Sequence, residues 1–373
     1  MPDDAIQVEL GGDDQPVRSS GGPGGGKVVW LVVGLGLGFA LSYLFSSSTG
    51  GAPVAEGDTT TTTTAPLVLG VGATIPGFPD GLNILVSPGE GRALEVLTWP
   101  LQGEPFYRSI PLGDIDFSGD TAQFDASGQF LAATTALPDG MVLRGGRPNT
   151  FRVVASGVTG FSWHDSDPAD LAWSTFEDGE LQIWVSEDAG PGEVVARGVG
   201  LGDRVVAFGD WGFVVANPPT EVATQSHVID ASGAVMGTID GWVVTSHKSG
   251  RLLVTDVDGA SVVGVNDIET LFDLRTSGMD SVLIGAEFSP DGDRVALTGV
   301  TGLTIVELGD VTEAVSYPIR AGSDSISWSS DSRFVLVSTF RGVLVLDNET
   351  GETKRIFESD TTRAVAATPI GGP

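Results

Sequence analysis

The chain has 373 residues, with 19 lysines and arginines against 49 aspartates and glutamates, giving a formal net charge of −30 at pH 7. A surface this acidic repels phosphate backbones, which argues against nucleic-acid binding. The sequence has no cysteine, which excludes disulfides, thiol chemistry and a lipid anchor on cysteine. It has only three histidines, none at a ligand spacing from another. We therefore predict no metal site, no cofactor and no catalytic residue.

The first part of the sequence predicts a single membrane span. Residues 1–27 are acidic and Gly-rich, and we expect a short disordered cytoplasmic tail. Val28 to Phe45 contains no charged residue and is long enough to cross a bilayer core, which takes about 17 to 25 residues. Arg18 and Lys27 precede it, and the next basic residue is Arg92, so the positive-inside rule places the C-terminal part outside the cell. A cleaved signal peptide is the alternative, although the long segment before Lys27 argues against it.

The next segment, residues 46–79, is rich in Ser, Gly, Thr and Pro and includes six consecutive threonines from Thr59 to Thr64. Such a composition cannot bury enough apolar surface to fold, so we expect a flexible linker. The linker would hold the following domain, residues 80–371, away from the membrane.

A motif then returns about every forty residues. Its clearest copy runs from Phe288 through Ser289-Pro290-Asp291-Gly292 into the apolar strand Arg294 to Thr298. The residues that precede the turn of each copy are Phe124, Trp163, Phe208, Ser246, Phe288 and Trp328, at intervals of 39, 45, 38, 42 and 40. A period near forty with several short strands in each copy is typical of β-propeller blades. We expect the aromatic members of this set to pack between blades.

The two ends of the domain are predicted to complete one blade together. Leu82 to Ser87, Ala93 to Trp99 and Phe106 to Leu112 form three strands without a fourth. Arg363 to Ile370 is a lone strand near the C-terminus, about one period after the last motif copy. Because an open ring would leave unpaired edges, we predict seven four-stranded blades closed by N- and C-terminal strands, with six or eight blades as alternatives.

The segment from Phe288 to Leu297 resembles the WD40-like propeller repeat of the TolB type, an aromatic residue followed by Ser-Pro-Asp-Gly and an apolar strand. The resemblance covers roughly residues 80 to 370 and implies a bacterial, here membrane-anchored, propeller. The Trp-Asp dipeptides of eukaryotic WD40 blades are absent, and no α/β domain precedes the repeats. Membership of the Tol system is therefore not implied.

Propellers bind partners through the loops at the two ends of the ring. We therefore predict a non-catalytic module or scaffold that binds a protein or an envelope polymer. Arg144 and Arg147 lie in a Gly-rich segment, Arg144 to Asn149, that we expect to be a connection between strands. The candidate contact residues are Tyr107, Arg108, Arg144, Arg147, Trp211 and Arg275. One alternative is a propeller enzyme acting on sugars or lactones in the central channel, and another is an accessory envelope subunit that makes contacts through residues 1–27.

Two acidic runs offer closely spaced oxygen ligands, His164 to Asp170 and Asp256 to Gly259. Calcium takes six to eight oxygens, and neither run supplies a full set, so ordinary turns are the favoured interpretation. His164 and His247 both occupy hairpin positions of the repeat, and we expect them to be exposed turn residues.

Overall fold

The computed structural model describes residues 71–88, 93–111, 121–137, 140–198, 202–217, 225–256, 259–274, 283–299, 302–309, 314–319, 326–339, 342–358 and 362–370. The predicted tail, the predicted span Val28 to Phe45 and most of the linker lie outside these residues. No helix within the described ranges combines the length and apolar character needed to cross a membrane.

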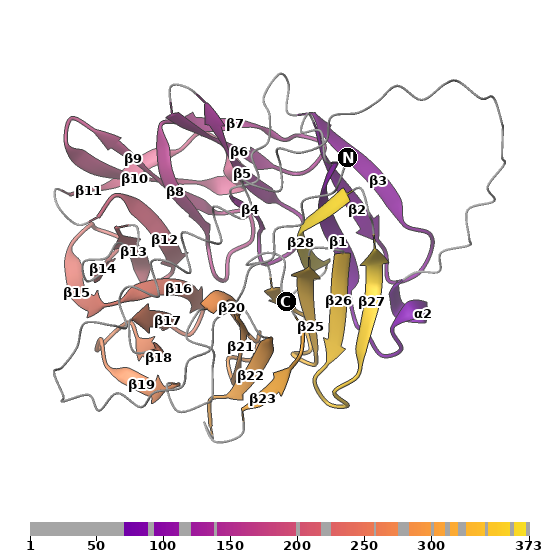
Figure 1. The fold of residues 1–373 in the computed structure, drawn as a ribbon. Coiled ribbons are helices and arrows are strands. Elements are labelled where there is room, and N and C mark those ends of the chain that lie inside the picture. Colours follow the sequence, from indigo (N-terminus) through magenta and orange to yellow (C-terminus); the bar gives the residue numbers. More distant parts are fainter. Residues whose placement is uncertain are drawn as a thin grey trace, which may run out of the picture.

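The described strands form seven four-stranded sheets arranged as a ring (Figure 1). Each sheet is antiparallel. The predicted seven-bladed propeller is confirmed. Its period-forty motif marks the hairpin between the innermost and second strands of a blade.

Blade 1 consists of β1 (Gly81–Pro88), β2 (Ala93–Trp99), β3 (Phe106–Pro111) and β28 (Thr362–Ile370). Blade 2 has β4 (Thr121–Phe124), β5 (Leu131–Leu137), β6 (Gly140–Gly146) and β7 (Arg152–Ser156). Blade 3 has β8 (Val158–Trp163), β9 (Leu171–Glu177), β10 (Glu180–Ser186), the 3-10 turn η1 (Glu187–Ala189) and β11 (Glu193–Gly198). Blade 4 has β12 (Arg204–Gly209), β13 (Gly212–Ala216), β14 (Gln225–Ile229) and β15 (Val235–Asp240).

Blade 5 has β16 (Trp242–His247), β17 (Arg251–Asp256), β18 (Gly259–Gly264) and β19 (Thr270–Asp273). Blade 6 has β20 (Leu283–Phe288), β21 (Arg294–Gly299), β22 (Leu303–Glu307) and β23 (Val315–Tyr317). Blade 7 has β24 (Ile326–Trp328), β25 (Phe334–Thr339), β26 (Gly342–Asp347) and β27 (Thr353–Glu358). Innermost strands of neighbouring sheets contact one another around the axis, from β8 through β12, β16, β20, β24 and β28 to β4.

The ring is closed in blade 1, as predicted. The C-terminal strand β28 becomes the innermost strand of the blade and pairs antiparallel with β1, from Gly81 opposite Ile370 to Pro88 opposite Thr362. Strand β3 is left at the outer edge of the same sheet.

Residues before the predicted domain start at residue 80 pack on the propeller. The short helix α2 (Val71–Thr74) docks on blade 1, where the Val71 N–H donates to the Pro100 carbonyl at 3.2 Å. Val71, Ile75 and Phe78 are buried in a cluster with side chains of blades 1 and 7. Three apolar side chains at helical and turn spacing outweigh the surrounding linker-like composition, so the end of the predicted linker packs on the propeller.

Aromatic anchors pack between blades, as expected. Trp163 of blade 3 is buried and donates from its indole Nε1 to the Gln123 carbonyl of blade 2 at 3.0 Å. Trp328 of blade 7 does the same to the Glu287 carbonyl of blade 6, at 3.2 Å. In blade 5 the anchor is His247 rather than Ser246, and its ring lies 5.7 Å from that of Phe288. The core is therefore a set of separate clusters, each shared by two neighbouring blades.

Candidate functional site

At one end of the ring, hydrogen bonds join the segments that connect innermost and second strands in neighbouring blades. We call these segments, which include the loops His164 to Asp170 and Ser289 to Gly292, the hairpin belt. Arg251 donates to the Gly292 carbonyl of the next blade at 2.6 Å. The Asn83 amide of blade 1 donates to the Gly128 carbonyl of blade 2 at 2.7 Å. Between blades 7 and 1, the Ser330 hydroxyl donates to Asp80 at 2.6 Å. These polar groups are therefore hydrogen-bonded to the neighbouring blade instead of being available to bind a ligand.

One hairpin in this belt collects an imidazole and several carboxylates. The loop from His164 to Asp170 joins β8 to β9, and it is held to blade 4 because the Asp165 N–H donates to the Phe208 carbonyl at 3.0 Å. Within the loop, the His164 N–H donates to the Asp170 carbonyl at 2.9 Å. The His164 ring stands edge-on to Phe208, with 4.5 Å between ring centroids.

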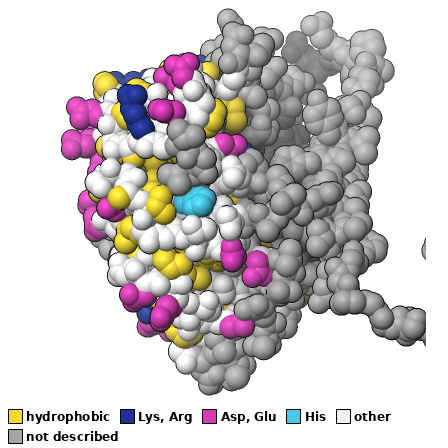
Figure 2. Space-filling model, turned by 90° about the vertical axis from the view of Figure 1, so that its left-hand side faces the viewer, with side chains coloured by type: hydrophobic (Ala, Val, Ile, Leu, Met, Phe, Trp, Pro, Cys, Tyr) yellow, Lys and Arg dark blue, Asp and Glu magenta, His cyan; other side chains and the backbone are white. Residues whose placement is uncertain are grey.

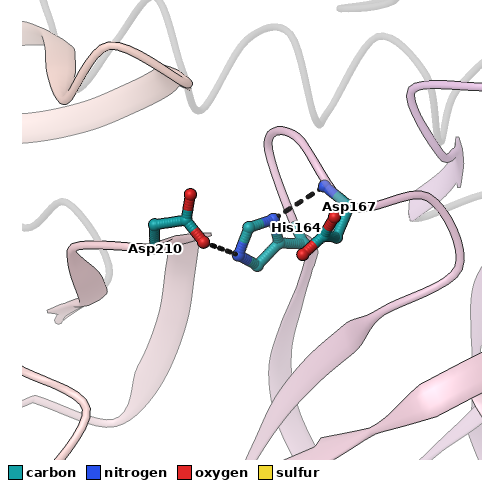
Figure 3. Close-up of side chains that lie close together, drawn as sticks. All are labelled: His164, Asp167 and Asp210. Carbon is teal, nitrogen blue, oxygen red and sulfur yellow. Dashed lines mark hydrogen bonds and ion pairs between the residues drawn. The ribbon is translucent and has the colours of Figure 1, made fainter.

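The His164 imidazole has a polar neighbour at each of its nitrogens (Figure 3). Its Nδ1 accepts from the backbone N–H of Ser166 at 3.2 Å and of Asp167 at 2.9 Å. Its Nε2 lies 3.6 Å from an Asp210 carboxylate oxygen in the next blade. Two donors at Nδ1 require the neutral ring to carry its proton on Nε2, from where it faces the exposed Asp210.

His247 has the same arrangement in blade 5. Its Nδ1 accepts from the Ser249 N–H at 3.2 Å, and its Nε2 lies 3.3 Å from the Pro290 carbonyl of blade 6. Burial lowers the pKa of His247 below its ordinary value. Our expectation that both histidines are exposed turn residues is wrong: His164 is 6% and His247 9% exposed. In each hairpin the imidazole caps the turn, as the Ser289 hydroxyl does for the Arg294 N–H in blade 6 at 3.0 Å.

One ligand atom each from His164, Asp167 and Asp210 could approach a common cation, since these three atoms lie within 4.8 Å of one another. The proton position argues against it. A metal on Nε2 would need the ring proton on Nδ1, where two backbone N–H groups already point. We interpret the group as a capped turn.

Two neighbouring carboxylates are also accounted for. Asp165 accepts from the Trp211 indole Nε1 at 3.1 Å, and burial raises its pKa above the ordinary value despite this hydrogen bond. In the second acidic run, Asp256 accepts from the Gly259 N–H at 3.0 Å, as in an ordinary hairpin turn. That neither run binds calcium stays a prediction.

Of the six candidate contact residues the structure describes five, which lie in blades 1, 2 and 4. Arg144 lies within β6 rather than in a connection, because the strand continues through Gly145 to Gly146; its Nε is buried and has no hydrogen-bond partner within the described part. Arg147 follows in the turn, with its guanidinium 4.9 Å from the centre of the Phe130 ring. Trp211 belongs to the hairpin belt through Asp165, and Arg275 lies outside the described residues.

Tyr107 and Arg108 are consecutive residues of β3, so their side chains project from opposite faces of the strand. Tyr107 is 61% exposed, more than any other large hydrophobic side chain that is exposed in the described part, and Phe106 beside it is 41% exposed. The Arg108 guanidinium lies 5.0 Å from the centre of the Phe106 ring. Two exposed aromatic rings and an arginine are the residue types that dominate binding at protein interfaces.

On the described outer strands of the other blades, the exposed hydrophobic side chains include no aromatic ring. Exposed hydrophobic side chains on other outer strands are aliphatic, such as Val195 on β11 and Val235 and Met236 on β15. On the side of the ring that contains these strands, acidic side chains are scattered between hydrophobic ones rather than gathered into one patch (Figure 2). Blade 1 therefore carries the most distinctive exposed surface among the described residues.

Sequence reasoning missed two residues, Phe106 and Glu287. Phe106 could have been found from the aromatic pair that opens an outer strand. Glu287 lies on the innermost strand of blade 6, where the Thr245 hydroxyl of blade 5 donates to it at 3.4 Å. Protein atoms crowd its carboxyl although part of the side chain stays accessible, and this burial raises its pKa to about 8. The sequence feature that could have indicated Glu287 is an acidic residue directly before the Phe288 anchor on an apolar strand.

No protein-family model matches the sequence, and no curated protein does either. Among solved structures, a functionally unknown protein from Desulfotomaculum acetoxidans has a TM-score of 0.52 at 10% sequence identity, over 79% of this chain and 100% of its own. TolB from Acinetobacter baumannii has a TM-score of 0.45 at 13% identity, over 83% and 88%. AztD from Citrobacter koseri has a TM-score of 0.46 at 10% identity, over 79% and 99%. At these identities the likeness extends to the fold alone, and of these three structures only the first has a TM-score above 0.5.

Proposed function

We propose that this chain is a single-pass membrane protein whose propeller lies outside the cell and binds a protein or an envelope polymer without catalysing a reaction. The observation that carries the binding role is the exposed surface on β3, formed by Phe106, Tyr107 and Arg108. A soluble body gains nothing in folding from two exposed aromatic rings on one edge strand, so a contact with another molecule is the better explanation.

The belt of hairpins supports the non-catalytic part of the proposal. A catalytic site needs a nucleophile or acid–base pair that is free to act. The His164 and His247 rings are instead held as turn caps: His164 Nδ1 and both nitrogens of His247 face backbone groups, and His164 Nε2 faces the carboxylate of Asp210.

The placement in the cell rests on the sequence. Val28 to Phe45 is uncharged, and the basic residues Arg18 and Lys27 lie on its N-terminal side. Protease treatment of intact cells is expected to release a compact propeller fragment cut between residues 46 and 70, while the N-terminal tail stays protected. Full protection of the propeller would contradict this orientation.

The binding role is tested by placing a photo-reactive amino acid at residue 107 of the full chain in living cells. We expect a discrete crosslinked product that is identified by mass spectrometry. The matched control is the same amino acid at Val315 on β23, an outer-strand position that is 49% exposed. Equal products at the two positions would point to random collision, and no product at 107 would contradict the role of β3.

One observation favours a second candidate, an enzyme with its site at the axis of the ring. Glu287 is a carboxyl on an innermost strand, and burial raises its pKa to about 8, which suits a general acid. A panel of sugar and lactone substrates, tested with the wild-type chain and with Glu287→Gln, decides the matter. Turnover that Glu287→Gln removes would establish this candidate in place of the binding module.

A further inference from the structure

The outer edges of the seven blades differ in how they are protected against further strand pairing. Five of the outer strands pair with their neighbours through a register shift: β7, β11, β15, β19 and β27. A bulge of this kind twists the edge away from a regular ladder. The sixth, β23, pairs over only three residues. Six of the seven edges are therefore blunted.

Strand β3 is the exception. It pairs with β2 in an unbroken register of six residues, from Ala93 opposite Pro111 to Thr98 opposite Phe106. Its four residues from Phe106 to Ser109 are all exposed. No lysine and no proline interrupts this stretch, although Pro111 ends the strand. The outward backbone groups of β3 thus form a regular row next to two exposed aromatic rings.

Natural proteins avoid long, regular and apolar edges because such edges pair with other chains. An edge left open in one blade, when six others are blunted, is the arrangement expected of a site for strand addition. In this mode a partner supplies an extended segment, whose main chain bonds to the edge and whose alternate side chains contact the neighbouring surface.

We propose that β3 binds an extended peptide segment of a partner protein, which adds to blade 1 as a fifth strand. This inference rests on the proposed binding function and narrows it to one surface and one kind of partner. Phe106 and Arg108 lie on one face of the strand and Tyr107 on the other, so an added strand meets an aromatic side chain on both faces.

The net charge of the protein favours a partner segment over a second copy of the chain at the edge of β3. A second copy would bring together two propellers whose chains, from residue 46 onward, each have 17 lysines and arginines against 44 aspartates and glutamates, a balance of −27, and their repulsion opposes pairing. A segment with basic residues is instead attracted by the body as a whole and meets the exposed carboxylate of Glu104 just before β3. The expected partner segment therefore alternates apolar with polar side chains and carries net positive charge.

The first test selects binders for the purified full chain in detergent from a displayed library of short random peptides. Selected peptides are expected to alternate apolar residues with Lys or Arg. In hydrogen exchange, they should slow the amides of alternate residues between Phe106 and Ile110 by roughly tenfold or more. Protection confined to the hairpin belt, or no protection in β3, overturns the proposal.

The second test changes the main chain. Consecutive residues of a strand point their N–H groups to opposite sides, so of Tyr107→Pro and Arg108→Pro, one removes an outward donor and the other breaks a bond to β2. The first is expected to abolish binding of a selected peptide at an unchanged unfolding midpoint, and the second to lower the midpoint. Tyr107→Thr keeps the N–H and strand propensity, and should weaken binding without abolishing it. Undiminished binding by both proline variants overturns the inference.

These outcomes are separable from the proposed function itself. A partner that is captured in cells equally well by the wild type and by the outward-donor proline variant leaves the binding module standing and rejects the β3 site. Peptides that protect β3 in vitro, with no crosslinked product in cells, leave the site standing and reject the cellular role. A dimer in sedimentation that the proline variant dissociates would identify a second copy as the occupant and reject the partner segment.

Discussion

Glu287 makes the stability of the propeller depend on pH in a direction that can be worked out. Burial raises the pKa of this carboxyl from 4.5 to about 8. The folded protein therefore holds the proton more tightly than the unfolded chain does. Stability from this group is fully present below the unfolded pKa and is lost as the pH rises through the folded pKa.

The size of the effect follows from the difference between the two pKa values. One unit corresponds to about 1.4 kcal/mol, so the shift amounts to about 3 to 5 kcal/mol lost between pH 4.5 and a little above pH 8. The glutamine of Glu287→Gln mimics the protonated carboxyl and stays uncharged at every pH. We expect the variant and the wild type to be similarly stable at about pH 4.5 or below, and the variant to be more stable by several kcal/mol at about pH 9.

Denaturant unfolding followed by tryptophan fluorescence across this pH range measures the difference. Other carboxyls also titrate, so the decisive quantity is the wild type minus the variant at each pH. Glu307→Gln, which changes an exposed acid on β22 of the same blade, is the matched control and should give parallel curves. Parallel curves for Glu287→Gln as well would refute the reasoning.

Three further outcomes are expected. Gly128→Ala should destabilise by more than Gly157→Ala, since both glycines have positive φ but only the first would press a Cβ against the carbonyl end of β28; the second should cost about 1 kcal/mol, the conformational penalty alone, by thermal or denaturant unfolding. Trp163→Phe should cost about 1 to 3 kcal/mol, because it leaves a carbonyl of the preceding blade without its indole donor; an unchanged midpoint would show that the bond contributes nothing. Millimolar calcium should not change the unfolding midpoint of either the wild type or Asp210→Asn. A midpoint that calcium raises only in the wild type would indicate a metal site at this group.

The propeller could be predicted because its determinants are local and repeated. The Asp291-Gly292 turn and the Phe288 anchor specify a hairpin and a packing position within one short segment, and the same chemistry recurs in other blades. Closure through β28 was also predictable, since three unpaired strands at one end of the domain required a fourth from elsewhere.

The candidate site was harder to predict, because its residues act across blades. His164 looked like an exposed turn residue since nothing in its own segment shows that its ring faces Phe208 and Asp210. We predict Arg144 in a connection because Gly145 and Gly146 resemble a turn, whereas both glycines belong to β6, the third strand of blade 2. The regularity of β3 is a comparison between seven edges, and no single strand sequence contains it.

The pairing of β28 with β1 also constrains the order of events during synthesis. Among the described strands, β1 is made first and its inner neighbour last. A ribosome-bound chain therefore holds six blades and an incomplete first one, with the inner side of β1 unsatisfied until β28 emerges. Any partner or chaperone that reaches the nascent protein before that moment meets a different molecule from the finished ring.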